Sequence, residues 1–87
     1  MINMELEFKR SALKQLKYYK KKNPIAYKII HEKLEEIMKN PWDIRFEKVK
    51  KYPKYKRARK GDYRICFKVE NDCIYIGRIE GRPKAYH

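Results

Sequence analysis

The sequence predicts an α+β fold with the element order β-α-α-β-β-β, in which two antiparallel helices pack on one face of an antiparallel sheet. Three observations predict it. Apolar and acidic residues alternate near the start, two lysine-rich stretches carry apolar residues at helical spacing, and three short alternating runs follow. The helices and the strands each present one apolar face, and these faces bury each other in a single domain spanning residues 1–87.

The first half of the chain supplies one strand and both helices. Residues 4–8 alternate as a half-buried strand does, and a helical pattern runs over about 9–22. Asn23, followed by proline, is a strong start signal for a second helix because its side chain caps the first turn. That helix ends at Asn40, before another proline. Its apolar stripe comprises Ala26, Ile30, Leu34 and Ile37.

The second half supplies three strands. After an irregular stretch over about 42–53, the alternating runs at 55–60, 63–70 and 73–79 are separated by two-residue turns. The residues expected on the buried sheet face are Ile65, Phe67, Val69, Ile74 and Ile76. The opposite face should be exposed to solvent, because side chains alternate along each strand.

The most informative local feature is a hairpin rich in arginine. If 61–62 is its turn, antiparallel counting pairs Arg59 with Arg64 and Arg57 with Cys66. Arg57, Arg59 and Arg64 then share the exposed face. Like charges directly opposite each other weaken a ladder, so this face favours a bound polyanion. The alternative is a solvated face whose long side chains splay apart.

The charge points in the same direction. Lysine and arginine total 24 against 11 acidic residues, a formal net charge of +13. Nucleic acid is the first partner to expect, because phosphate contacts release counterions. An acidic protein partner is compatible as well. No long apolar stretch suggests a membrane partner, and no signal peptide is visible at the N-terminus, so we expect a cytoplasmic protein.

The sequence contains few of the usual catalytic motifs. There is no glycine-rich phosphate loop, Ser11 is the only serine, and no metal-ligand spacing is present. The simplest register places Cys66 opposite Gly77 and Cys73 opposite Glu70, so a disulfide is not expected, and two cysteines alone make no zinc site. We therefore expect no metal and no cofactor.

Cleavage of RNA by its own 2′-hydroxyl needs only what this chain offers. The catalyst must hold the phosphate in line and stabilise added negative charge, which arginine does through bidentate contacts. A DNA nuclease lacks the internal nucleophile and would normally recruit metal carboxylates. Lysines predicted to contribute RNA contacts are Lys48, Lys50, Lys51, Lys56, Lys60, Lys68 and Lys84.

The chain resembles the RelE/ParE toxin superfamily of bacterial and archaeal toxin–antitoxin pairs. The residues that carry the resemblance are Phe8, Ala12, Leu13 and Leu16, then Ile37, Asn40 and Pro41, the run Arg57-Ala58-Arg59-Lys60-Gly61-Asp62-Tyr63-Arg64, and Gly81-Arg82 with Tyr86. They cover nearly the whole chain. The arginine-rich run, together with the terminal arginine and tyrosine, is the more specific part.

The resemblance implies a microbial-ribonuclease-like fold and, for the RelE branch, cleavage of messenger RNA in the ribosomal decoding site by 2′-hydroxyl attack. The catalytic positions it implies are Arg57, Arg59, Arg64, Arg82 and Tyr86, with Tyr86 stacking on a messenger base. The best-studied branch has lysines where arginines stand here. Candidates for the proton-transfer groups therefore stay open: Lys56, Arg59, Tyr86 and His87.

Two other functions remain alternatives. ParE-like toxins of the same superfamily inhibit DNA gyrase without cleaving RNA, and a basic RNA-binding module without chemistry would also explain the charge. The implied partners are the ribosome, messenger RNA and an acidic RelB-type antitoxin. Such an antitoxin would fold on binding and form a toxin–antitoxin hetero-oligomer.

Overall fold

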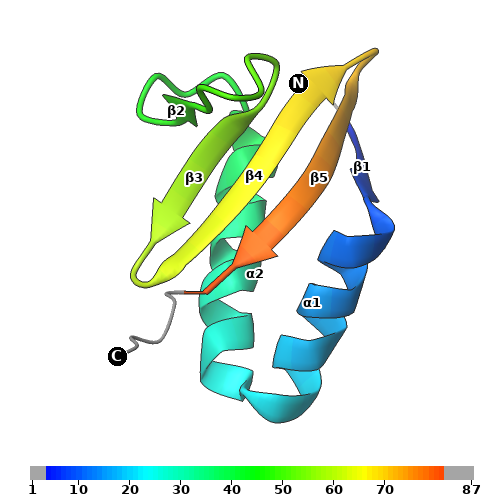
Figure 1. The fold of residues 1–87 in the computed structure, drawn as a ribbon, viewed down its shortest axis with the longest axis vertical. Coiled ribbons are helices and arrows are strands. Elements are labelled where there is room, and N and C mark those ends of the chain that lie inside the picture. Colours follow the sequence, from blue (N-terminus) through cyan, green and yellow to red (C-terminus); the bar gives the residue numbers. More distant parts are fainter. Residues whose placement is uncertain (1–3, 82–87) are drawn as a thin grey trace.

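The computed structural model describes residues 4–81, which form two helices and five strands. In chain order the elements are β1 (Glu5–Phe8), α1 (Arg10–Lys22), α2 (Pro24–Lys39), β2 (Glu47–Lys48), β3 (Lys56–Lys60), β4 (Tyr63–Glu70) and β5 (Cys73–Glu80) (Figure 1). The predicted helices and three C-terminal strands are confirmed to within about a residue at their ends. The sequence prediction missed β2, a two-residue strand within the stretch expected to be irregular.

The sheet is mixed, with strand order β1-β5-β4-β3-β2. Strand β1 pairs in parallel with β5, whereas every other neighbouring pair is antiparallel. The prediction of a wholly antiparallel sheet is therefore wrong at this edge. The reason is topological: α1 and α2 reverse the chain twice, so β3 runs as β1 does, and the two hairpins after β3 give β5 that direction again.

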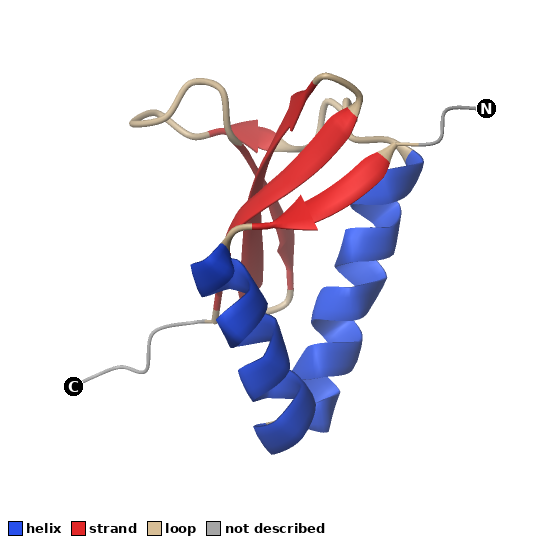
Figure 2. Ribbon diagram, turned by 90° about the vertical axis from the view of Figure 1, so that its right-hand side faces the viewer, coloured by secondary structure: helices blue, strands red, loops and turns tan. Residues whose placement is uncertain are grey.

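Both helices pack on the same face of the sheet. Helix α1 contacts β5 and β1, while α2 contacts β3 and β4. The connection between them extends beyond the ends of the strands, as Figures 1 and 2 show. Asn23 starts α2 as predicted, because its Oδ1 accepts a hydrogen bond of 3.1 Å from the amide of Ala26.

The core lies between the helices and the inner sheet face. Its buried residues are Ala12, Ile30, Leu34, Ile37, Phe46, Ala58, Ile65, Phe67, Ile74, Ile76 and Ile79. Phe46 comes from the segment before β2, where no apolar pattern marks it. Its ring meets that of Phe67 edge to face, with centroids 5.4 Å apart. Phe46 thus closes the core beside α2, where the sheet alone would leave it open.

The register of the arginine-rich hairpin is confirmed. Arg59 lies opposite Arg64, and Arg57 lies opposite Cys66. Gly61 at the turn has a φ of +59°, a conformation that glycine adopts without strain.

A β-bulge in β5 changes which side chains reach the outer face. Cys66 pairs with Arg78 and Phe67 pairs with Ile76, which leaves Gly77 as the extra residue. The predicted pairing of Cys66 with Gly77 is therefore wrong, whereas that of Cys73 with Glu70 is confirmed. Strict alternation after Ile76 would have buried the Arg78 side chain. The bulge turns Arg78 outward and lets Ile79, 2% exposed, enter the core.

Candidate nucleic-acid interface

Four arginines gather on the outer face of the sheet, and we call this set the arginine face: Arg57 and Arg59 of β3, Arg64 of β4 and Arg78 of β5. They form two adjacent rows across the strands. One row runs from Arg57 through Cys66 to Arg78, and the next runs from Arg59 through Arg64 to Glu80. The structure therefore brings together the three described arginines that the sequence predicted. It adds Arg78, for which Gly77 inside a strand pattern was the available signal.

A groove of about 340 Å³ opens on this face. Its lining residues are Lys9, Val49, Tyr52, Tyr55, Arg57, Cys66, Gly77, Arg78 and Glu80. The volume falls within the usual range of small-ligand sites, about 300–1,000 Å³. A second hollow of about 480 Å³ adjoins it between α1 and β5, and both are lined by Lys9 and Arg78. Sequence reasoning missed Lys9, which directly follows β1.

The groove contains cationic donors that are only partly neutralised. Arg78 Nε lies 2.8 Å from a carboxylate oxygen of Glu80, and 71% of the Arg78 side chain is exposed. Within residues 4–81, Arg57 Nε is buried without a hydrogen-bond partner. A guanidinium in this state favours a ligand that supplies acceptor oxygens to its remaining N–H groups.

Cys66 lies between these two arginines but is a poor nucleophile. Burial raises the pKa of its thiol, and the Glu80 carboxylate acts in the same direction, while Arg57 and Arg78 oppose the shift. The thiol therefore stays protonated near neutral pH, and the neutral sulfur contributes packing rather than covalent chemistry.

Aromatic side chains border the groove on the side of the β2–β3 connection. The Tyr52 and Tyr55 rings meet edge to face, with centroids 6.3 Å apart. Lys68 Nζ lies 5.6 Å from the Tyr55 centroid and 5.5 Å from that of Tyr75. Lys68 thus lies on the outer face, as predicted, next to the arginine rows.

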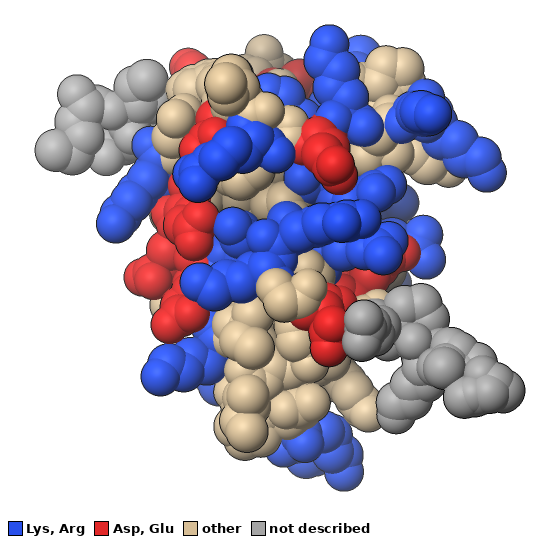
Figure 3. Space-filling model, turned by 90° about the vertical axis from the view of Figure 1, so that its left-hand side faces the viewer, with Lys and Arg blue, Asp and Glu red and all other residues tan. Residues whose placement is uncertain are grey.

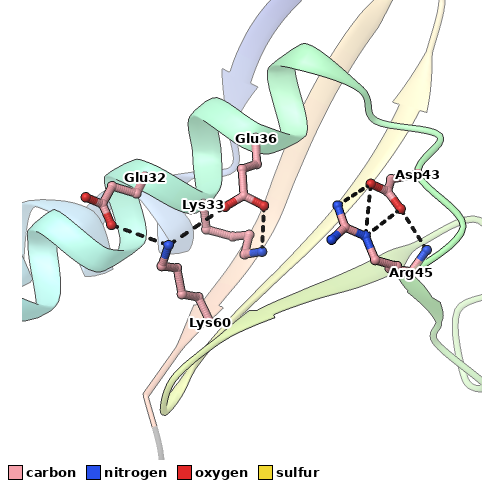
Figure 4. A network of polar contacts seen from close by, with 6 residues as sticks. All are labelled: Glu32, Lys33, Glu36, Asp43, Arg45 and Lys60. Atoms are coloured by element: carbon pink, nitrogen blue, oxygen red, sulfur yellow. Dashed lines mark hydrogen bonds and ion pairs between the residues drawn. The ribbon is translucent and has the colours of Figure 1, made fainter.

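The other lysines predicted to bind RNA have different surroundings. Lys60 lies on the helix side, where its Nζ is 3.5 Å from Glu32 and 3.8 Å from Glu36 (Figure 4). Lys56 alternates onto that same side, opposite Phe67. These two lysines therefore do not join the arginine face. Lys48 lies on β2, and the exposed Lys50 and Lys51 follow it.

Four of the predicted site residues lie outside the described part of the chain: Arg82, Lys84, Tyr86 and His87. The described strand β5 ends at Glu80, next to Arg64 in the sheet. The roles of these four residues stay predictions.

The positive surface continues around the β3 edge. A cleft of about 250 Å³ there is lined by Lys33, Arg45, Phe46, Glu47, Arg57 and Arg59. Figure 3 shows a band of lysine and arginine side chains across this side of the molecule, with acidic side chains scattered around it. Arg45 Nη2 lies 2.7 Å from Asp43, and this contact lowers the pKa of Asp43 to about 2 (Figure 4).

Among residues 4–81, one group has side chains spaced to hold a metal ion: Glu5, Glu7 and Cys73, whose ligand atoms lie within 4.8 Å of one another. Cys73 and Arg78 are five residues apart on β5. At about 3.3 Å per residue the separation along the strand is roughly 16 Å. This acidic end of the sheet is therefore separate from the arginine face.

Neither described helix is long and apolar enough to span a membrane.

A comparison with known protein families identifies the family to which this chain belongs. Residues 6–86 match the model of the ParE toxin of the type II toxin–antitoxin system parDE. The chain belongs to this family. It is a type II toxin of the wider RelE/ParE/YoeB superfamily, as its sequence predicts. None of the curated proteins compared matches the chain.

Solved structures share the fold over almost the whole chain. The isolated E. coli RelE toxin superposes with a TM-score of 0.77 at 17% identity, covering 94% of this chain and 87% of RelE. The YoeB–YefM complex of Staphylococcus aureus gives 0.74 at 25% identity, covering 97% of both chains. The RelB–RelE complex of Methanococcus jannaschii gives 0.63 at 27% identity, covering 86% and 88%.

Proposed function

We propose that this toxin is a metal-independent endoribonuclease that cleaves messenger RNA in the ribosomal decoding site and so blocks translation in the cytoplasm. The single observation that carries the proposal is the arginine face, in which three adjacent strands present four guanidinium groups and two of these, from Arg57 and Arg78, line one groove. Such a face suits a phosphate whose negative charge increases during reaction.

The chemistry that fits this face is internal transesterification. The 2′-oxygen forms a bond to phosphorus as the bond from phosphorus to the 5′-oxygen breaks, leaving a 2′,3′-cyclic phosphate and a 5′-hydroxyl. Arg57 and Arg78 face each other across Cys66 and can grip non-bridging oxygens from two sides. Arg64 in the adjoining row stabilises the pentacoordinate state.

The reaction also needs a group that takes the 2′-hydroxyl proton and one that protonates the leaving 5′-oxygen. Lys56 faces away from the groove by strand alternation, whereas Arg59 lies on the arginine face. Lys9, which lines the groove, joins Arg59, Tyr86 and His87 as a candidate.

Gyrase inhibition without RNA cleavage is the second candidate. It is favoured by one observation, the match to the family model named for ParE toxins. The two functions make different demands on the arginine face, because a gyrase inhibitor needs no groove that can hold a phosphate in line.

The positive charge of the arginine face also suggests which kind of protein would inhibit the toxin. Structures similar to this chain include toxins in complex with RelB and YefM antitoxins. With a formal net charge of +13, this chain calls for an acidic antitoxin whose carboxylates oppose the arginine face in a toxin–antitoxin hetero-oligomer.

A paired assay tests the proposal. Purified toxin is added to ribosomes programmed with a defined messenger RNA and, separately, to gyrase with relaxed plasmid. We expect discrete RNA cuts and normal supercoiling. Loss of supercoiling with intact messenger RNA would contradict the proposal and support gyrase inhibition instead.

A further inference from the structure

The sequence and the family comparison leave the aromatic border of the groove without a role. Tyr52 is 62% exposed, and its ring packs edge to face against that of Tyr55. Core packing does not explain the position of Tyr52. Tyr52 lines the groove on the outer face of the sheet, whereas the core lies on the other face. We call Tyr52 and Tyr55 together the tyrosine shelf.

The shelf is held in place before any ligand arrives. The amide of Val49 donates to the carbonyl of Tyr55, that of Tyr52 to Val49, and that of Tyr55 to Tyr52, at 3.1, 3.2 and 2.8 Å. These three hydrogen bonds close the loop, and Pro53 restricts it further. A preorganised ring loses little conformational entropy on binding.

Glycine at position 77 makes room for the shelf. A Cβ at this position would lie 2.7 Å from Cε2 of Tyr55, which is closer than such atoms approach each other. Lys68 contacts the Tyr55 ring from the neighbouring strand. The bulge residue that turns Arg78 into the groove therefore also seats Tyr55, which places aromatic and cationic groups side by side.

We propose that the tyrosine shelf is a nucleobase subsite, which stacks one unpaired base of the RNA whose phosphate is held by Arg57 and Arg78. The proposal rests on the ribonuclease function and assigns it a further binding site, in addition to the stacking predicted for Tyr86. Aromatic rings beside a basic groove are the usual means of binding single-stranded RNA, because every base has a π-face. The groove therefore presents aromatic rings to a base and guanidinium groups to its phosphate.

The test is an abasic scan. Messenger RNAs in which single nucleosides around the cleavage site are replaced by abasic ribose are cut on programmed ribosomes by the full-length toxin and by Tyr52→Ala. We expect Tyr52→Ala to lower kcat/KM for intact RNA by about 5- to 150-fold, mainly through KM. Removing the base at one position should lower kcat/KM of the parent by a similar factor. At that position, Tyr52→Ala should cut the abasic RNA as efficiently as it cuts intact RNA.

Two variants serve as controls. Tyr52→Phe keeps the ring and should retain most activity. Tyr18→Ala removes a tyrosine of similar exposure, 58%, which packs on Tyr19 of the same helix and does not line the groove. It should leave the abasic profile unchanged.

The outcomes separate this proposal from the function on which it rests. A parent that cuts no RNA would contradict both. A parent that cuts RNA while Tyr52→Ala matches it at every position would overturn the tyrosine shelf alone. The same holds if Tyr52→Ala weakens only the binding of an acidic antitoxin, because the shelf would then be a protein contact.

Discussion

The two faces of strands β3, β4 and β5 carry opposite kinds of side chain. On the inner face, Ala58, Ile65, Phe67, Ile76 and Ile79 are at most 2% exposed and pack against the helices. The outer face instead places one arginine directly opposite another on neighbouring strands. The inner face supplies the stability that a small domain needs, and this allows the outer face to carry charges that weaken the ladder.

The largest expected effect is on the inner face. Phe67→Ala removes a fully buried ring that also supports Phe46, so it should lower the free energy of unfolding by about 3–5 kcal/mol. Urea denaturation followed by circular dichroism measures this change. Val69→Ala, at a half-buried position of the same strand, is the matched control and should cost clearly less. Equal losses would show that the fully buried Phe67 ring contributes no more to stability than a half-buried side chain on the same face.

The corresponding change on the outer face should leave the fold intact. Arg64→Ala should lower the rate of RNA cleavage by about 10²–10³-fold, the usual effect of losing one preorganised donor. Its free energy of unfolding should not fall by more than about 0.5 kcal/mol. Arg10→Ala, at an exposed arginine of α1, controls for the loss of one positive charge. A folded Arg64→Ala protein that cuts at the parental rate would remove Arg64 from the site.

Relieving the repulsion should stabilise the protein. Arg59→Thr replaces one of the two facing arginines by a residue suited to strands, and should raise the free energy of unfolding by about 0.2–1 kcal/mol at low salt. The gain should shrink as salt screens the repulsion, whereas Arg59→Lys, which keeps the charge, should show little gain. Stability below that of the parent would show that Arg59 contributes packing that outweighs the repulsion.

The smallest effect concerns the Asp43–Arg45 pair at the β3 edge. The pKa of Asp43 falls to about 2 in the folded protein from a usual value of 3.8, so its stabilising contribution is complete above about pH 4. That contribution is lost as the pH falls towards 2. Asp43→Asn should therefore be less stable than the parent at pH 6, and the difference should disappear near pH 2. A difference independent of pH would exclude the ion pair as its cause.

The same contrast explains how far the sequence could predict the structure. Local patterns were sufficient for the helices, the hairpin register and the three outer-face arginines 57, 59 and 64, because alternation and turn residues determine them. The bulge at Gly77 was missed because it breaks that alternation, and with it Arg78 was missed. The parallel pairing of β1 with β5 and the place of Phe46 depend on contacts between distant segments, which no local pattern records.

The most direct test of the arginine face is whether the nucleophile belongs to the RNA. A messenger RNA carrying a single 2′-deoxyribose at the cleavage position is compared with the all-ribose messenger on programmed ribosomes, with EDTA added at a level that keeps the ribosomes intact. The all-ribose RNA should give a 2′,3′-cyclic phosphate, or the 3′-phosphate derived from it, with a 5′-hydroxyl on the downstream fragment. The deoxy position should stay uncut. Cleavage at the deoxy position would contradict the account, because the nucleophile would then have to come from elsewhere.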